Sequence, residues 1–265
     1  MANLFFPQLT SGAYAQYPLQ KTRAARTIKN VLADGSMVVF ADPGSSQLYW
    51  QLSFAELTAV EASVLKAHFE ACAGPVRAFT FIDPTDNMLV WSSDLTAAVW
   101  LRASDVGLSA GADDPMGGSS AFTVTNNAAI SEEITQTLTT PANYHYCFSL
   151  YAKSAAPSLL TLVRRGASTE AATAYDIGPA WTRLVCAGEL GDAATDITVA
   201  IRLSAGQQVT LYGPQLEPQL APSRYRASGA RGGVHPNAHW AVDDLLLTAT
   251  APNLFSTVFS IEATL

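Results

Sequence analysis

Two histidines and an aspartate lie four residues apart near the end of the chain, at His235, His239 and Asp243. On a helix, this spacing would put three ligands on one face, where they could hold a metal ion. Pro236 and the glycine pair before His235 disfavour a helix here. We therefore interpret the two histidines as exposed loop residues, and we expect no metal centre.

Adjacent carboxylates occur at residues 113–114, 132–133 and 243–244. Glycoside cleavage needs two carboxyl groups that converge on one bond. Neighbouring residues of a strand point to opposite faces, so these pairs do not converge. No Ser/His/Asp or Cys/His arrangement stands out either. The sequence predicts that the protein is not an enzyme, and a glycan depolymerase is the less favoured alternative.

Tryptophan and tyrosine residues are frequent between residues 89 and 225. Sugar rings can stack on exposed aromatic faces, whereas aromatic side chains within a sandwich more often pack in its core. In "YHYCFSLYA", alternation places Tyr146 and Phe148 on one face, which we expect to be core, and Tyr151 on the other. The candidates for contact with a carbohydrate are Trp100, Tyr151 and Trp181.

Four basic residues and no acidic residue occur in "KTRAARTIKN": Lys21, Arg23, Arg26 and Lys29. This pattern is typical of a solvated strand face, and it also fits a docking surface for an acidic neighbour. The whole chain has a net charge of −7, which argues against binding to nucleic acid or anionic lipid. No apolar run is long enough for a membrane span.

The first ninety residues carry strand signals and one helix signal. Asp34-Gly35 lies between two β-rich runs and predicts a hairpin, and residues 47–54 alternate like a further strand. Thr58 and Glu61 form a capping box at the start of a helix that we expect to end near Gly74. A further predicted strand follows the helix and ends at an Asp-Pro pair. These elements predict a small β-barrel or sandwich with one helix packed across it.

From residue 89 to about 224, eight short alternating segments are separated by Gly, Pro, Asn and Ser. Turns spaced in this way predict an antiparallel jelly-roll sandwich. Residues 240–252 and 253–265 then read as two more strands, which need a sheet to join. The sequence therefore predicts an all-β protein with one packed helix. Its first domain comprises residues 1–88 plus 226–265, and a jelly roll of residues 89–225 is inserted into it.

Several of these segments, in order, resemble a known pattern. "NMLVWSSDLTAAVW", "YHYCFSLYAKS", "WTRLVCAGEL" and "VTLYGPQLEPQLAPSRY" are similar to the carbohydrate-binding-module-like jelly roll of bacteriophage tail proteins. "WQLSFAELTAVEASVLKAHFEACAGPVRAFTFIDP" resembles the N-terminal barrel of phage distal tail proteins. The resemblance to the jelly roll covers about half of the chain, and the resemblance to the barrel is shorter.

The resemblance implies a structural virion protein, assembled in the cytoplasm of a bacterial host. It would be a subunit of a homo-oligomeric ring, usually a hexamer, that joins the tail tube to the tail-tip and hub proteins of the baseplate. Lys21, Arg23, Arg26 and Lys29 would then contact neighbouring subunits or the tube. The alternative is a receptor-recognition protein whose jelly roll binds host surface glycan.

The same resemblance bears on cofactors. Jelly rolls of this kind often hold a structural calcium ion where their first and last strands meet, and Asp94 and Glu217 would be its oxygen donors. No other cofactor is expected.

Overall fold

The computed structural model describes residues 3–264, with the side chains of residues 42–45 excepted. The chain divides into two compact units. The helix-containing unit comprises Met1–Phe81 and His235–Leu265, and the sandwich comprises Ile82–Val234. In the described part, no helix is long and apolar enough to cross a membrane.

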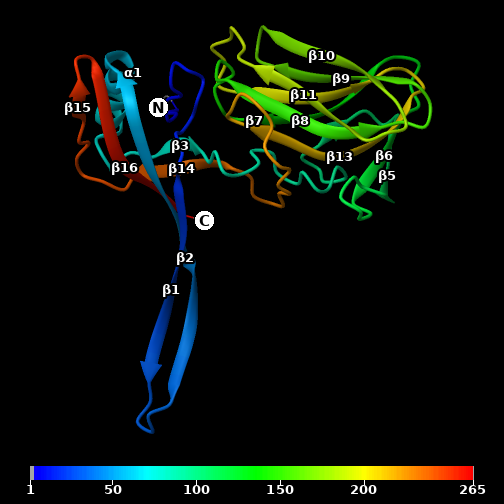
Figure 1. Cartoon of the computed structure of the whole chain (residues 1–265). Helices are drawn as coiled ribbons and strands as arrows, with labels where there is room; N and C mark the ends of the chain where they lie inside the picture. Colours follow the sequence, from blue (N-terminus) through cyan, green and yellow to red (C-terminus); the bar gives the residue numbers. More distant parts are fainter. Residues whose placement is uncertain (1–2, 265) are drawn as a thin grey trace. The chain divides into compact units, whose positions relative to one another are not determined.

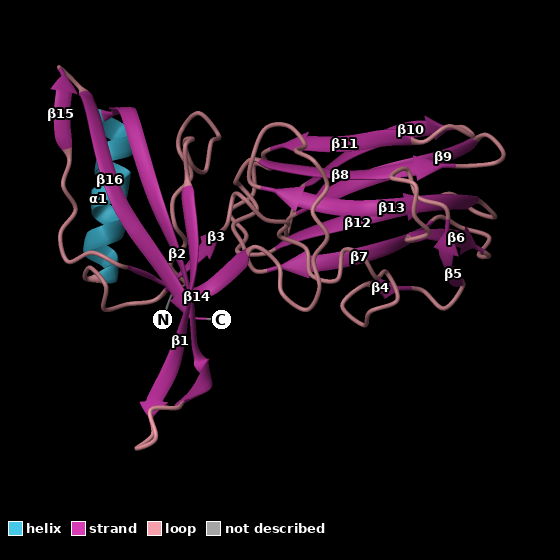
Figure 2. Cartoon of the chain, turned by 60° about the horizontal axis from the view of Figure 1, so that its bottom comes forward, coloured by secondary structure: helices cyan, strands magenta, loops and turns pink. Residues whose placement is uncertain are grey.

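The helix-containing unit is a six-stranded sheet with one helix against it (Figures 1 and 2). The strand order is β1-β2-β16-β14-β3, and β15 pairs with β16. The helix α1 contacts β2 and β16. The elements are β1 Gln20–Val31, β2 Met37–Thr58, α1 Ala59–Cys72, β3 Phe79–Ile82, β14 Val234–Trp240, β15 Thr248–Ala251 and β16 Leu254–Thr264.

The last strand of the chain closes the sheet that the first residues begin. β16 runs antiparallel to β2, with Ile261 opposite Trp50 and Phe259 opposite Leu52, and these four side chains are buried. β3 and β14 are neighbours in this sheet, so the chain leaves the unit and re-enters it along adjacent strands. An insertion between two such strands disturbs little of the sheet.

The helix starts where the capping box predicts. Thr58 is the N-cap, its side chain accepts a hydrogen bond from Glu61 N, and the Glu61 side chain accepts one from Thr58 N. Desolvation by burial raises the pKa of Glu61, but hydrogen bonds from Thr58 and Thr10 outweigh it and leave the pKa lowered. At the other end, Ala73 adopts the left-handed conformation and Gly74 follows it, so the C-cap lies one residue before the predicted one.

The sandwich consists of two five-stranded antiparallel sheets, β10-β9-β12-β7-β4 and β11-β8-β13-β6-β5. Side chains from both sheets fill the space between them. The strands are β4 Leu101–Arg102, β5 Val106–Ala112, β6 Ala121–Asn126, β7 Glu132–Leu138, β8 Tyr146–Lys153, β9 Ser158–Arg165, β10 Glu170–Ile177, β11 Thr182–Gly188, β12 Ile197–Leu203 and β13 Gln208–Glu217. The predicted fold class, all-β with one helix and a discontinuous first unit, is confirmed.

Three predicted details are wrong. The second strand of the predicted hairpin and the separate strand predicted over residues 47–54 are one continuous strand, β2. The strand expected over residues 240–252 is replaced by β14 and β15, and the residues between them are irregular. His235 and His239 therefore lie on a strand and not in an exposed loop. The His235 ring lies 4.8 Å from that of Trp50, and His239 Nδ1 donates to Pro75 O.

The joins between the units also differ from the predicted residues 88/89 and 225/226. The chain enters the sandwich at Ile82 and leaves it at Val234. The reason is hydrogen bonding. Asn87 Nδ2 donates to Pro214 O and Arg226 O, and Met88 N donates to Leu216 O. These bonds tie both connecting segments to β13 and hence to the sandwich.

Burial sets the protonation state of His68, a titratable group in the core of the helix-containing unit. His68 of α1 lies between Phe6 and Phe79, at ring-centroid distances of 5.7 and 4.8 Å. Burial disfavours the imidazolium and lowers the pKa of His68 to about 4. The unfolded chain therefore binds a proton here between about pH 6.5 and about pH 4, while the folded chain does not.

We predict that this difference lowers the stability of the protein as the pH falls. Between about pH 7 and about pH 5, the wild type should lose about 2 kcal/mol more unfolding free energy than His68→Leu, which cannot titrate. Urea denaturation at both pH values measures this difference. Parallel pH dependence in the two proteins would contradict the assignment of a neutral, buried His68.

Candidate functional site

The strand β8 separates the sandwich core from an outer face. Leu150 and Ala152 point into the core and are fully buried, while Tyr151 and Lys153 alternate with them and are partly exposed. A strand side chain changes face at every residue, so this alternation leaves an aromatic and a basic residue on the outer side of the sheet.

The pairing of β8 with its two neighbours extends this arrangement across the sheet. Tyr151 lies opposite Arg183 of β11 and opposite Tyr212 of β13. Arg183 Cζ lies 5.3 Å from the centroid of the Tyr151 ring, and the rings of Tyr151 and Tyr212 are 6.2 Å apart. Tyr151, Arg183 and Tyr212 are partly exposed, whereas the alternating Leu184 and Leu211 are buried.

Trp181 comes directly before β11 and extends the same surface. Its ring lies 4.8 Å from Lys153 Nζ, a cation–π distance. Trp181 is partly exposed. We use the term aromatic face for the outer surface of β11, β8, β13 and β6. It carries Trp181, Arg183, Tyr151, Lys153, Thr210, Tyr212 and Thr123.

One end of this outer surface is covered. Gln215 and Glu217 lie on the same side of β13 as Tyr212, and both are fully buried. Arg226 covers them: its N donates to Gln215 Oε1 at 2.7 Å, and its Nη2 donates to Glu217 Oε1 at 2.8 Å. The end with Tyr151 and Trp181 therefore remains accessible, and the other end is part of the packed structure.

Tyr225 supports Tyr212 from the covered end. Its ring lies 5.1 Å from the Tyr212 ring and packs on Gly213, where an added Cβ would approach the Tyr225 ring to 3.0 Å. Gly213 has a φ of +64°, so a larger residue would be strained as well as crowded. Burial raises the pKa of Tyr225 to about 12. Burial, followed by Asp114 and Tyr151, also raises the pKa of Tyr212, so this phenol keeps its O–H donor at neutral pH.

Of the three predicted carbohydrate contacts, the structure brings two together. Tyr151 and Trp181 both lie on the aromatic face. Trp100 does not, because only 2% of it is exposed and its indole N–H donates to Trp91 O at 3.0 Å. A buried ring cannot stack on a ligand, so the assignment of Trp100 is wrong and its role is packing.

The two predicted calcium ligands have other partners. Asp94 Oδ1 accepts hydrogen bonds from Thr96 N and Thr96 Oγ1, as in an Asx turn. Glu217 is bound by the Arg226 guanidinium and by Ser223. A cation already neutralises Glu217, which weakens it as a ligand for a second cation. Among the residues whose side chains the structure describes, no group of three or more His, Cys, Asp or Glu could hold a metal ion.

The predicted contact residues Lys21, Arg23, Arg26 and Lys29 are all exposed on β1. β1 is an edge strand, and the part of β2 before Gln47 pairs with β1 while the later part also pairs with β16. The distal part of this hairpin is therefore two-stranded and extends beyond the rest of its sheet (Figure 1).

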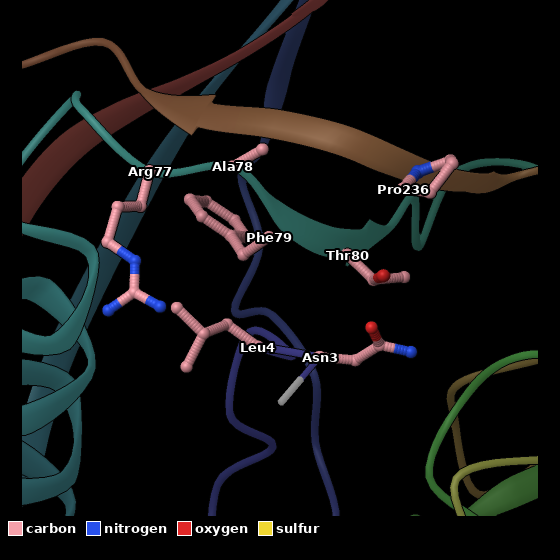
Figure 3. Close-up of a pocket in the computed structure, with 7 residues that line it drawn as sticks. All are labelled: Asn3, Leu4, Arg77, Ala78, Phe79, Thr80 and Pro236. Carbon is pink, nitrogen blue, oxygen red and sulfur yellow. The ribbon is translucent and has the colours of Figure 1, made fainter. Parts of the chain in front are cut away.

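A cavity of about 360 Å³ lies in the helix-containing unit, between the N-terminal segment and β3 (Figure 3). Arg77 is the one charged residue among the seven that line it, and its Nη1 donates to Ala71 O at 2.9 Å. A cavity lined in this way offers no pair of groups for acid–base chemistry.

The predicted site residues do not include the other charged and aromatic residues of the aromatic face, Lys153, Arg183 and Tyr212. Each is at an outward position of an alternating strand, and this signal is present in "SLYAKS", "WTRLV" and "VTLYG". The sequence does not show that these strands are neighbours, so their joint position on one face could not be read from it.

Comparison with known proteins finds solved structures that are similar to about half of the chain. No protein-family model and no curated protein sequence matches the chain. Among solved structures, the C-terminal family 22 carbohydrate-binding module of Xyn10B from Clostridium thermocellum has 18% identity and a TM-score of 0.42, over 54% of this chain and 99% of that module. The CBM22-1 xylan-binding domain of Xyn10C from Paenibacillus barcinonensis has 16% identity and a TM-score of 0.41, over 50% and 94%.

A domain of tailspike protein 4 of bacteriophage CBA120 has 13% identity and a TM-score of 0.42. The match covers 52% of this chain and only 22% of that chain. At these identities the similarity concerns the fold alone. All three TM-scores lie below 0.5, so these similarities assign neither a family nor a function to the chain.

We predict that Trp100→Ala lowers the stability of the protein. Removing a fully packed tryptophan should lower the unfolding free energy by about 3–5 kcal/mol. The control is Trp91→Ala, because the Trp91 side chain is 40% exposed and its carbonyl, which accepts from Trp100, is retained. Chemical denaturation measures both variants. A change below about 0.5 kcal/mol for Trp100→Ala would show that the ring is not part of the core.

Proposed function

We propose that the sandwich binds a glycan on the aromatic face and that the protein is not an enzyme. The observation that carries the proposal is the group of partly exposed rings of Tyr151, Tyr212 and Trp181 on one side of one sheet. Such rings present apolar surface to the faces of sugar rings, and their polar tips remain available for hydrogen bonds.

The surroundings of the rings support the same function. Thr210 and Thr123 lie opposite each other on β13 and β6, and their partly exposed hydroxyls can pair with sugar hydroxyls. The β-strands that carry these groups form a rigid platform, so a ligand would bind without a large ordering cost.

A glycan depolymerase needs two carboxyl groups that converge on one bond, and one of them must act as a general acid. Glu133 and Glu170 are brought together on the outer side of the other sheet, but each binds both Arg165 and Arg202. Hydrogen bonds and ion pairs to these arginines lower the pKa of Glu170, although burial alone would raise it. A carboxylate held in its charged form in this way is a poor general acid.

We predict that Tyr151→Ala and Trp181→Ala each weaken glycan binding by about tenfold or more, because each removes a stacking surface. A glycan array finds the bound sugar, and titration calorimetry measures the change in affinity. The control is Leu159→Ala, which removes a side chain that is 42% exposed on the strand β9 of the other sheet. Full affinity in both aromatic variants would exclude the aromatic face as the binding site.

We propose, second, that the helix-containing unit assembles into a ring in a phage tail. The distal hairpin of β1 and β2 supports this. Ile28 lies opposite Phe40 on one face, and Val31 lies opposite Met37 on the other, with 48, 52, 73 and 57% of each residue exposed, respectively. A two-stranded ribbon with apolar side chains on both faces is stabilised when neighbours cover it.

The resemblance of the sequence to distal tail proteins supports a hexameric ring between the tail tube and the hub proteins, in a virion assembled in the host cytoplasm. In such a ring, the basic residues of β1 would meet acidic surface of the next subunit. Exposed carboxylates of the helix-containing unit, Glu56, Asp243 and Asp244, provide such a surface.

We predict that the wild type forms oligomers at high concentration and that Ile28→Asp/Phe40→Asp dissociates them without loss of secondary structure. Light scattering measures the mass, and circular dichroism measures the fold. Val76→Asp is the control, because Val76 is exposed outside the hairpin, and this variant should remain assembled. A wild type that is monomeric at every concentration tested would contradict the ring.

A further inference from the structure

The aromatic face carries two basic side chains at its accessible end. Lys153 Nζ lies over the Trp181 ring, and the Arg183 guanidinium lies over the Tyr151 ring. Arg183 pairs with Tyr151, two residues before Lys153 on the neighbouring strand, so the backbone positions of the two basic residues are roughly 7 Å apart.

Neither cation has a carboxylate partner in the part of the chain whose side chains the structure describes. Arg183 Nη2 donates to the neutral Ser149 Oγ at 3.0 Å, and the three donors of the Lys153 ammonium have no acceptor in that part of the chain.

On the opposite sheet of the sandwich, the outward-facing arginines are paired with carboxylates. On its outer side, Arg165 and Arg202 are both paired with Glu133 and Glu170 at 2.7–3.0 Å. The sandwich has 14 acidic and 9 basic residues, so carboxylates are abundant in it. Two cations without a described carboxylate partner therefore lie beside the partly exposed rings of the aromatic face.

We propose that the ligand of the aromatic face is an anionic glycan, in which a sugar ring stacks on Tyr151 or Trp181 while its carboxylate, sulfate or phosphate group binds Lys153 and Arg183. A cation positioned beside a stacking ring recognises a negative group on the same sugar. The net charge of the chain is −7, so without these local cations the protein would repel such a polymer. This inference rests on the glycan-binding function proposed above.

The test compares polymers that share a sugar backbone and differ in their anionic groups. Polygalacturonate is compared with its fully methyl-esterified form, and sulfated galactan is compared with desulfated galactan. The whole protein is used, and affinity is measured by biolayer interferometry. We expect tighter binding, by about tenfold or more, to at least one anionic polymer than to its neutral counterpart, and weakening of that binding by added salt.

Variants that remove positive charges test whether Lys153 and Arg183 cause the preference for the anionic polymer. Lys153→Met/Arg183→Met should weaken binding to the anionic polymer by about tenfold more than binding to the neutral polymer, so that the preference is lost. Arg202→Gln, which removes a paired arginine from the other sheet, is the matched control and should keep the preference. Equal affinity for both members of every pair, or a preference that survives loss of both cations, overturns the inference. Absence of binding to all four polymers and to a broad glycan array contradicts the proposed glycan-binding function itself.

Discussion

The alternation of side chains along β8 is the constraint on which both the core and the candidate site of the sandwich depend. Tyr146, Phe148 and Leu150 fill the space between the sheets, and Tyr151 can face outward only because they face inward. A slip of one residue in the pairing with β11 or β13 would send the tyrosine into the core and a leucine to the surface. The packing energy of the core therefore also fixes the geometry of the aromatic face.

The helix-containing unit depends on a comparable long-range pairing. β16 pairs with β2 although the whole sandwich separates them in the sequence, and the rings of Trp50, Trp240 and Phe259 are buried in this unit. The chain must therefore bring together segments that are about two hundred residues apart, a slow step because loop closure precedes the contacts that stabilise it. The two units have separate cores, so the sandwich can vary its outer face without disturbing the sheet of the other unit.

Much of the fold could be predicted, because it depends on residues that are close together in the sequence. The capping box of Thr58 and Glu61, the hairpin turn at Gly35 and the eight alternating segments of the sandwich are all decided by neighbouring residues, and the structure contains each of them. β5 was missed, since its glycine- and serine-rich sequence has little of the β-branched character that marks a strand.

The site was less predictable, because it depends on which strands are neighbours. Tyr151 and Trp181 were identified by residue type, but their contacts with Arg183 and Lys153 follow from the register between β8 and β11. Trp100 is also aromatic, but it is buried, and its indole N–H donates to the backbone carbonyl of Trp91, nine residues earlier. Residue type therefore identifies candidates, and only the pairing of strands decides between a core position and a surface position.

The central claim is that one outer face of the sandwich binds a glycan. Hydrogen–deuterium exchange of the whole protein, with and without a saturating oligosaccharide cut from a polymer that it binds, tests this claim most directly. The account predicts slower exchange in peptides that cover β8, β11 and β13, and no change in β7, β9, β10 and β12. Protection confined to that second sheet or to the hairpin of β1 and β2 would contradict it.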